Sequence, residues 1–254
     1  MPERPAYAVV GRGNWAGRMS SLLKDESCRV TNIPDARIKP NESDANYIDR
    51  LASAFRASHA AIAWLCVVPG PHVSSMISAA IDAGMHAIIE KPWLGSAREA
   101  ETLTQLAVAH GVLLGVHFEY CLLNEIQDWR RRFNGGPGLR FNGRFAISRA
   151  SRLDIPAMLN LGVHLFAIRK YAVPEAEIGE ISTAYESDDE RRVWIETESV
   201  EFTHNRQPII ERFLRLFEDA TEGAEFPFGI DFARRVSEEA AKYPAPQTAA
   251  SHPP

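Results

Sequence analysis

Short apolar runs alternate with segments of helical spacing through the first 116 residues, and this alternation restricts the fold more than any other feature of the chain. The runs at 7–10, 60–68 and 87–90 have the length of buried strands. Between them, apolar residues recur three and four positions apart, as on the buried face of an amphipathic helix. A regular exchange of strands and helices is typical of a parallel, doubly wound sheet, so we predict an α/β fold class.

The pattern changes near residue 118. Beyond it we predict strands at 140–149, 178–186 and 192–203, and helices at 122–133, 156–172, 208–220 and 230–242. We expect the last two strands to be antiparallel, separated by a charged turn at 187–190. The predicted domains are therefore 1–118 and 119–243, the second a reduced α+β domain. Residues 244–254 contain four prolines and no periodicity, which predicts a disordered tail.

The charge balance and the cysteine content exclude several classes of protein. The 254 residues carry 28 Lys and Arg against 33 Asp and Glu, which argues against a nucleic-acid or anionic-membrane partner. The stretch 60–68 is about half of the ~20 residues that a membrane-spanning helix needs, and the first ten residues contain no signal-peptide core. Three widely spaced cysteines and eight scattered histidines indicate neither a disulfide framework nor a metal site. We therefore expect a cytoplasmic protein.

A glycine-rich turn joins the first predicted strand to the first predicted helix. Its sequence, G-R-G-N-W-A, fits the dinucleotide-binding pattern G-x-G-x-x-[G/A]. The first glycine permits a tight turn, the second lets the backbone approach a pyrophosphate, and the small sixth residue allows close helix–strand packing. The helix N-terminus offers free N–H groups to the anion. We predict a dinucleotide-binding Rossmann domain over 1–118, with candidate cofactor residues Gly11, Arg12, Gly13, Asn14, Trp15 and Ala16.

The residues after the second predicted strand leave the choice of cofactor open. An acidic residue about 20 positions beyond the glycine motif can accept a hydrogen bond from the ribose 2′-hydroxyl of NAD, and Asp35 follows the second strand. Arg12, Arg37 and Lys39 could instead contact the 2′-phosphate of NADP. Each of these charges is equally compatible with an ordinary solvated loop. The sequence therefore predicts NAD(P) without deciding between NAD and NADP.

The tripeptide Glu90-Lys91-Pro92 follows the predicted strand at 87–90. Ligands of open α/β sheets bind at the carboxyl ends of the strands. Pro92 restricts Lys91 to an extended backbone, which could direct its ammonium group into the crevice. There it could hydrogen-bond a substrate hydroxyl or carbonyl, or tune a proton transfer. Taken alone, the tripeptide favours a surface lysine paired with Glu90.

The order of these motifs resembles the Gfo/Idh/MocA oxidoreductases, the superfamily of glucose–fructose oxidoreductase and inositol dehydrogenase. After the glycine turn come V-V-P-G-P-H at 67–72, A-A-I-D-A-G at 79–84 and E-K-P at 90–92, and P-I-I-E-R-F-L at 208–214 is similar to the family's closing helix. The resemblance covers about residues 5–242. It implies a Rossmann domain, a second domain with an open antiparallel sheet that could support a homodimer, and hydride transfer between NAD(P) and a hydroxyl, carbonyl or imine carbon.

The resemblance also implies roles for individual residues. The lysine of E-K-P lies near the nicotinamide and the substrate in the family, so this role carries over to Lys91, and the preceding Glu90 is a candidate cofactor-binding residue. Pro69 and His72 stand at positions that lie beside the cofactor. A histidine at a helix N-terminus is an equally good interpretation of His72.

The segment N-L-G-V-H at 160–164 corresponds to the family pattern D-x-G-x-H. Asn160 and His164 are four residues apart and share one face of the predicted helix, and His164 could exchange a proton near physiological pH. Asn160 departs from the family's aspartate: an amide cannot exchange a proton, so we expect it to orient the substrate. The family often has an arginine near 116–121, where this chain instead offers His117 and Tyr120 as candidate substrate residues.

These observations predict an NAD(P)-dependent oxidoreductase acting on a polar small molecule such as a sugar or cyclitol derivative. Lys91 orients the reacting atom, His164 is the acid/base candidate and Asn160 positions the substrate. The alternative is a family member that has lost catalysis and serves as a ligand-binding or assembly protein. Asn160 and the short second domain motivate that alternative.

Overall fold

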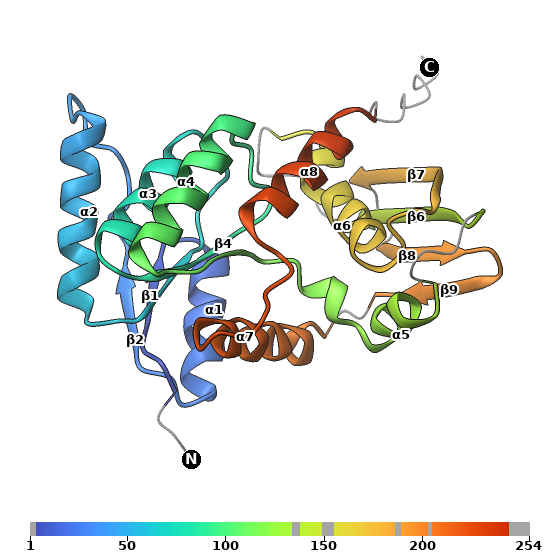
Figure 1. Ribbon diagram of the computed structural model, residues 1–254, viewed down its shortest axis with the longest axis horizontal. Coiled ribbons are helices and arrows are strands. Elements are labelled where there is room, and N and C mark those ends of the chain that lie inside the picture. Colours follow the sequence, from blue (N-terminus) through green and yellow to red (C-terminus); the bar gives the residue numbers. More distant parts are fainter. Residues whose placement is uncertain (1–3, 134–137, 149–154, 186–188, 203–204, 244–254) are drawn as a thin grey trace, which may run out of the picture. The chain divides into compact units, whose positions relative to one another are not determined.

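The computed structural model describes residues 4–133, 138–148, 155–185, 189–202 and 205–243. The chain divides into two compact units (Figure 1). The first contains Met1–His117 together with Leu214–Arg234, and the second contains Phe118–Phe213 together with Arg235–Pro254. The predicted tail at 244–254 lies outside the described residues. None of the helices in the described ranges is both long enough and apolar enough to cross a bilayer.

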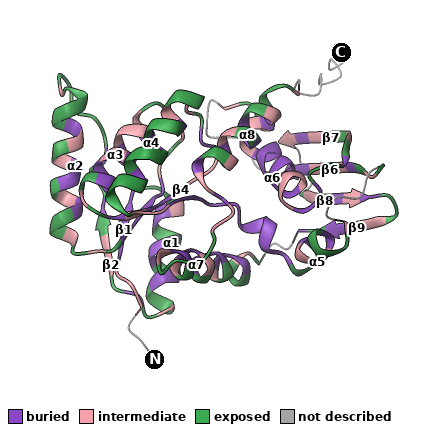
Figure 2. Ribbon diagram, in the orientation of Figure 1, coloured by how far each residue is buried: buried purple, intermediate pink, exposed green. Residues whose placement is uncertain are grey.

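A five-stranded parallel sheet forms the centre of the first unit, which confirms the predicted α/β class. Its strands are β1 (Tyr7–Val10), β2 (Val30–Ile33), β3 (Ile62–Leu65), β4 (His86–Ile89) and β5 (Leu114–Val116). The spatial order is β2-β1-β3-β4-β5, and β1 pairs in parallel with both of its neighbours. Every residue of β1 and β3 is buried, as Figure 2 shows in purple, because helices cover both faces of a parallel sheet.

Four helices connect the strands of this sheet. They are α1 (Asn14–Asp25), α2 (Asp44–Ser58), α3 (His72–Asp82) and α4 (Ala97–His110). Right-handed crossovers place α1 on one face and the group of α2, α3 and α4 on the other (Figure 1). The helix ends follow local sequence signals. The Ser43 side chain accepts a hydrogen bond from the Asn46 N–H, Ser96 and Glu99 form a reciprocal capping box, and Gly111 ends α4 in the left-handed conformation.

The C-terminal segment Leu214–Arg234 belongs to the first compact unit, whereas the sequence analysis assigned it to the second predicted domain. It contains parts of α7 (Gln207–Thr221) and α8 (Ile230–Ala241). A Cβ at Gly115 of β5 would lie 2.6 Å from Phe226 and 2.7 Å from Phe217, so these rings pack directly on the strand backbone. The Val116 N–H donates to the Phe228 carbonyl at 2.7 Å. The returning segment therefore supplies the last strand with packing and with a backbone partner.

A four-stranded mixed sheet forms the second unit. Its strands are β6 (Arg140–Ile147), β7 (Glu177–Tyr185), β8 (Glu190–Ile195) and β9 (Glu198–Glu201), in the spatial order β7-β6-β8-β9. The strands β6 and β7 are parallel, and the other two pairs are antiparallel. The expectation of an antiparallel sheet is corrected at this point, because a helical crossover joins β6 to β7 and such a connection returns the chain in the same direction. The predicted strand 192–203 is interrupted at Glu196, whose φ of 52° makes the turn of the β8–β9 hairpin.

Helical elements accompany this second sheet. A 3-10 turn, η1 (Glu119–Leu122), precedes α5 (Asn124–Phe133), and a π-helical turn, η2 (Met158–Gly162), leads into α6 (Val163–Ala172). The first six residues of α6 are all buried (Figure 2). A Cβ at Gly143 of β6 would lie 3.0 Å from Leu165, which shows how closely α6 approaches the sheet. This packing holds the 160–164 segment in the interior of the second unit.

Candidate functional site

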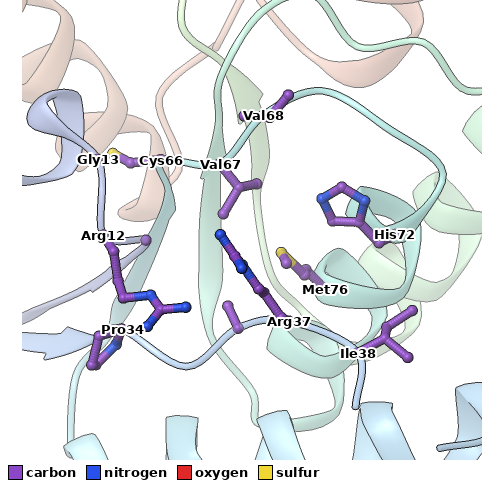
Figure 3. A pocket seen from close by; sticks show the side chains of 12 residues that line it. Arg12, Gly13, Pro34, Arg37, Ile38, Cys66, Val67, Val68, His72 and Met76 are labelled. Carbon is purple, nitrogen blue, oxygen red and sulfur yellow. The ribbon is translucent and has the colours of Figure 1, made fainter. Parts of the chain in front are cut away.

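A cavity of about 480 Å³ opens at the carboxyl ends of β1, β2 and β3 in the first unit (Figure 3). Its lining comes from the glycine turn, from the segments that follow β2 and β3, and from α3. The lining residues are Gly11, Arg12, Gly13, Pro34, Ala36, Arg37, Ile38, Cys66, Val67, Val68, His72 and Met76. The strand order reverses between β1 and β3, and this is the place where open α/β sheets bind their ligands.

Gly11 occupies a position that only glycine fits. Its φ is 129°, and a Cβ there would collide with the Cys66 carbonyl oxygen. The Gly11 N–H donates to the Ile33 carbonyl at 3.1 Å, which fixes the turn against the end of β2. A Cβ on Gly11 would also lie 3.5 Å from the Ala16 Cβ, so the small residue predicted at the sixth motif position packs against the turn. The turn is thus held close to the β3 segment.

Gly13 is the N-cap of α1 and leaves the helix N-terminus open. Its backbone is extended, no side chain caps the helix, and no atom lies within 4 Å of the place where a Cβ would be. Arg12, Gly13 and Asn14 are exposed. Uncapped N–H groups beside an open cavity suit the pyrophosphate of a dinucleotide. The chain's residues therefore fit the cofactor that the glycine motif predicts.

The segments after β2 and β3 place the other predicted cofactor residues. Arg37 lines the cavity, whereas Asp35 is exposed and is not among the lining residues. His72 lines the cavity from the first residue of α3, and burial lowers its pKa, opposed by a hydrogen bond with the Val68 backbone. Pro69 follows Val68 but is itself outside the lining.

A cluster of side chains surrounds the Glu90 carboxylate at the ends of β4 and β5, and three of its members, Glu90, Trp15 and His117, were predicted to bind cofactor or substrate. Glu90 Oε1 accepts hydrogen bonds from the indole N–H of Trp15 at 2.7 Å and of Trp64 at 3.0 Å. His117 Nδ1 lies 3.2 Å from the same oxygen, and an ionised carboxylate can only accept, so Nδ1 carries the proton in this pair. Burial disfavours the charged form, but His117 and the two indoles outweigh it, so the pKa of Glu90 lies below its usual value.

The cluster changes the expected roles of Trp15 and His117. Trp15 is not among the cavity-lining residues, and its ring instead stacks against His117 with 6.2 Å between centroids. His117, proposed from the sequence to contact substrate, is only 1% exposed and meets the edge of Trp64 at 5.3 Å. Sequence reasoning missed Trp64, because a tryptophan inside a buried apolar strand has no distinguishing signal. Lys91 follows Glu90 directly, is half-buried, and is joined to Pro92 by a cis peptide bond.

The other candidate catalytic residues belong to the second unit. His164 is 4% exposed and lies between aromatic rings, with Tyr120 edge-on at 4.9 Å and Phe145 stacked at 5.3 Å. Asn160 lies on the π-helical turn, and its side-chain N–H donates to the Tyr185 hydroxyl at 2.8 Å. The structure thus brings together His164 and Tyr120, which the sequence nominated separately.

Tyr120 is itself buried within this aromatic group. Its ring stacks on Phe202 at 4.9 Å, and its hydroxyl accepts a hydrogen bond from Arg191 at 3.4 Å. Burial and the nearby charge of Glu119 raise the pKa of Tyr120, so it remains a neutral phenol at physiological pH.

The comparison with protein families agrees with this geometry. Residues 6–118 match the model of Gfo/Idh/MocA, described as an oxidoreductase family with an NAD-binding Rossmann fold. The matched segment contains the glycine turn, the cavity residues and Glu90-Lys91-Pro92. Residues 6–118 are therefore similar to the NAD-binding Rossmann domain of this family. No curated protein sequence matches it.

Solved structures with the same fold include several oxidoreductases. The WlbA (WbpB) dehydrogenase of Thermus thermophilus, solved with NAD and α-ketoglutarate, is 14% identical with a TM-score of 0.73, over 97% of this chain and 98% of WlbA. An inositol dehydrogenase homologue of Azotobacter vinelandii, solved with NAD⁺, is 16% identical with a TM-score of 0.65, over 95% and 94%. UDP-N-acetylglucosamine 3-dehydrogenase GnnA of Acidithiobacillus ferrooxidans is 15% identical with a TM-score of 0.71, over 95% and 96%. At these identities the similarity shows the fold, which extends through both units.

The segment that matches the NAD-binding Rossmann fold contains every residue that lines the cavity. The turn residues Gly11, Arg12 and Gly13 meet the requirements for holding a pyrophosphate, and Arg37 and His72 complete the lining on the other side. Burial, together with the charge of Glu90, raises the pKa of the Cys66 thiol well above its usual value, so this lining residue stays protonated. The described residues contain no group of three or more His, Cys, Asp or Glu that could hold a metal ion.

Proposed function

We propose that this Gfo/Idh/MocA chain is an NAD(P)-dependent oxidoreductase. The reaction would transfer a hydride between the nicotinamide and a carbonyl, hydroxyl or imine carbon of a polar small molecule, such as a sugar or cyclitol derivative. The observation that carries the proposal is the open, uncapped glycine turn on a 480 Å³ cavity at the carboxyl edge of the sheet. The names of the similar solved structures, which include inositol and sugar-nucleotide dehydrogenases, support this substrate class.

The bound cofactor would supply or accept the hydride. The first unit would hold it with the backbone of Gly11 and Gly13 around the pyrophosphate. Lys91 would donate a hydrogen bond from its Nζ to the reacting oxygen or nitrogen of the substrate. That donation stabilises negative charge on the oxygen when a carbonyl is reduced.

Glu90, the residue directly before Lys91, would help to position it. Three donors hold its carboxylate at a fixed position, so the residue before Lys91 cannot swing into the cavity. The lowered pKa keeps Glu90 negative throughout the physiological range. The cluster would thus position the backbone from which Lys91 extends.

His164 would exchange the proton of the substrate hydroxyl. Its neutral imidazole takes the proton during alcohol oxidation, and its imidazolium returns it during carbonyl reduction. Asn160 would orient the substrate, since an amide offers hydrogen bonds without a proton to transfer. Its bond to Tyr185 fixes the orientation of the amide.

Asn160 also supports a second candidate function. The family pattern has an aspartate at this position, and its replacement by an amide favours a member that binds its ligands without turning them over. Such a protein would keep the cofactor site and lose the reaction.

Cofactor titration followed by turnover assays separates these functions. We expect NADH or NADPH to quench the tryptophan fluorescence. Trp15 lies in the glycine motif, and both Trp15 and Trp64 donate to the Glu90 carboxylate. Absence of binding by both cofactors at millimolar concentration would contradict the oxidoreductase and the impaired relative together. Binding without turnover over a panel of sugars, cyclitols and cyclic imines would favour the impaired relative. The Asn160→Asp variant extends the test, because a gain in turnover would identify a weakened enzyme.

A further inference from the structure

Arginine supplies every permanently charged side chain that lines the cavity. Of the lining residues, Arg12 and Arg37 are cationic and none is acidic. Both are exposed, and neither forms an ion pair with a carboxylate in the part of the chain that the structure describes. Figure 3 shows both side chains extending into the same space, one from the glycine turn and one from the segment after β2. The cavity therefore has positive charge that its own lining does not neutralise.

Asp35, the residue that could have accepted a hydrogen bond from a ribose hydroxyl, does not take part in the lining. Its neighbours Pro34 and Ala36 do line the cavity. Arg37 and Ile38 line it as well, whereas Asp35 is exposed and outside the lining. The Asp35 carbonyl also accepts a hydrogen bond from Arg50 at 3.2 Å.

Two side chains of α2 hold the backbone of this segment through hydrogen bonds. The Tyr47 hydroxyl donates to the Ala36 carbonyl at 2.7 Å, and Arg50 Nη2 donates to the Arg37 carbonyl at 2.8 Å. Arg50 is itself held by Glu42, with Nε 2.7 Å from the carboxylate, and this pairing lowers the pKa of Glu42 to about 2. The brace of Tyr47, Arg50 and Glu42 thus holds the backbone at Ala36 and Arg37, and the Arg37 side chain lines the cavity.

We propose that the dinucleotide bound by this cavity is NADP rather than NAD, with Arg37 and Arg12 contacting its 2′-phosphate. The inference rests on the proposed function and names the cofactor of the same site. The ribose 2′ position of a bound dinucleotide lies near the end of the second strand of such folds, where an acid suits the hydroxyl of NAD and an arginine suits the phosphate of NADP. A phosphate monoester carries about −1.5 to −2 charges at neutral pH, and guanidinium groups bind it through two parallel hydrogen bonds.

Isothermal titration calorimetry on the full chain tests the preference directly. We expect NADPH to bind at least about tenfold more tightly than NADH, which corresponds to about 1.4 kcal/mol. Adenosine 2′,5′-bisphosphate should show the same advantage over adenosine 5′-monophosphate, since these probes differ only in the 2′-phosphate. Higher salt should reduce the advantage, because screening weakens charge–charge attraction. Equal or tighter binding of NADH would overturn the inference and leave the proposed function intact, whereas no binding of either dinucleotide would overturn both.

Variants identify the residues responsible. Arg37→Ala and Arg12→Ala should each lower NADPH affinity about tenfold while leaving NADH affinity within about twofold. Arg98→Ala is the matched control, since it removes the same charge from an exposed position on α4 outside the lining, and it should change neither affinity. Asp35→Ala should also leave NADH binding unchanged. A loss of NADH affinity in that variant, with no effect of Arg37→Ala on NADPH, would contradict the assignment.

Discussion

The Glu90 cluster predicts an energetic coupling that a double-mutant cycle can measure. Trp15→Phe keeps an aromatic ring but removes the N–H that donates to the carboxylate at 2.7 Å. Glu90→Gln keeps the shape of the acceptor and removes its charge. The two single variants and the double variant therefore isolate the charge-assisted part of one hydrogen bond.

The expected magnitude follows from the charge of the acceptor. A hydrogen bond to a charged group contributes about 1.5–3 kcal/mol to the free energy of unfolding, and a neutral one about 0.5–1.5 kcal/mol. Trp15→Phe should therefore destabilise the wild type more than it destabilises the Glu90→Gln background. The difference, about 1 kcal/mol, exceeds the ~0.3–0.5 kcal/mol within which independent sites add.

Urea unfolding followed by far-ultraviolet circular dichroism measures these free energies without relying on tryptophan fluorescence, which the substitutions alter. The pH dependence adds a second readout. The pKa of Glu90 in the folded chain lies below its usual value of 4.5. The ionised carboxylate therefore contributes its full stabilisation above pH 4.5, and this stabilisation is lost as the pH falls through the pKa of the folded state. The stability advantage of wild type over Glu90→Gln should therefore shrink in acid.

A matched control comes from the second unit. The Trp129 indole donates to a different carboxylate, Glu198, at 3.1 Å, so Trp129→Phe should destabilise the wild type and the Glu90→Gln background equally. A coupling between Trp15 and Glu90 below about 0.5 kcal/mol, no larger than that of the control, would refute the reasoning. It would mean that the indole contributes by packing alone.

Three further predictions concern the turn, the proton transfer and the returning segment. Gly11→Ala should lower dinucleotide affinity at least tenfold in calorimetry, because a Cβ collides with the Cys66 carbonyl; unchanged affinity would show that the turn does not hold the cofactor. Lys91→Ala and His164→Ala should each lower kcat about 10²-fold or more, and wild-type rates would remove them from the mechanism. Gly115→Ala should lower the free energy of unfolding by about 1–3 kcal/mol in urea, because the added Cβ would lie 2.6–2.7 Å from two phenylalanine rings. An unchanged free energy of unfolding would show that these rings move aside without cost.

Sequence periodicity predicts the first unit well because its strands and helices connect in order along the chain. Each apolar run at 7–10, 60–68 and 87–90 overlaps an observed strand, and the glycine turn lies where the motif places it. Local patterns determine these features: the strand period, the helix caps and the conformational freedom of Gly11. Little long-range information is needed for such a fold.

The pairing in the second unit could not be predicted in this way. Alternation along β7 and β8 shows that both are strands, but it does not show that β6 separates them. Several site residues have no local signal either. Trp64 has the sequence context of any buried strand residue, and Arg50 that of an exposed helix residue, until their partners Glu90 and Arg37 are seen beside them. Contacts between residues distant in sequence define these roles.

The return of Leu214–Arg234 to the first unit has a consequence for synthesis of the protein. A ribosome releases the N-terminal 117 residues well before the segment that covers Gly115 and whose Phe228 carbonyl accepts a hydrogen bond from Val116. Until then, the edge strand β5 lacks its aromatic cover, and the Arg4 partner Glu218 is absent. The nascent chain therefore exposes an apolar sheet edge throughout translation of the intervening hundred or so residues. We expect chaperone dependence during this interval, and a gene fragment that stops at residue 118 should yield aggregated protein.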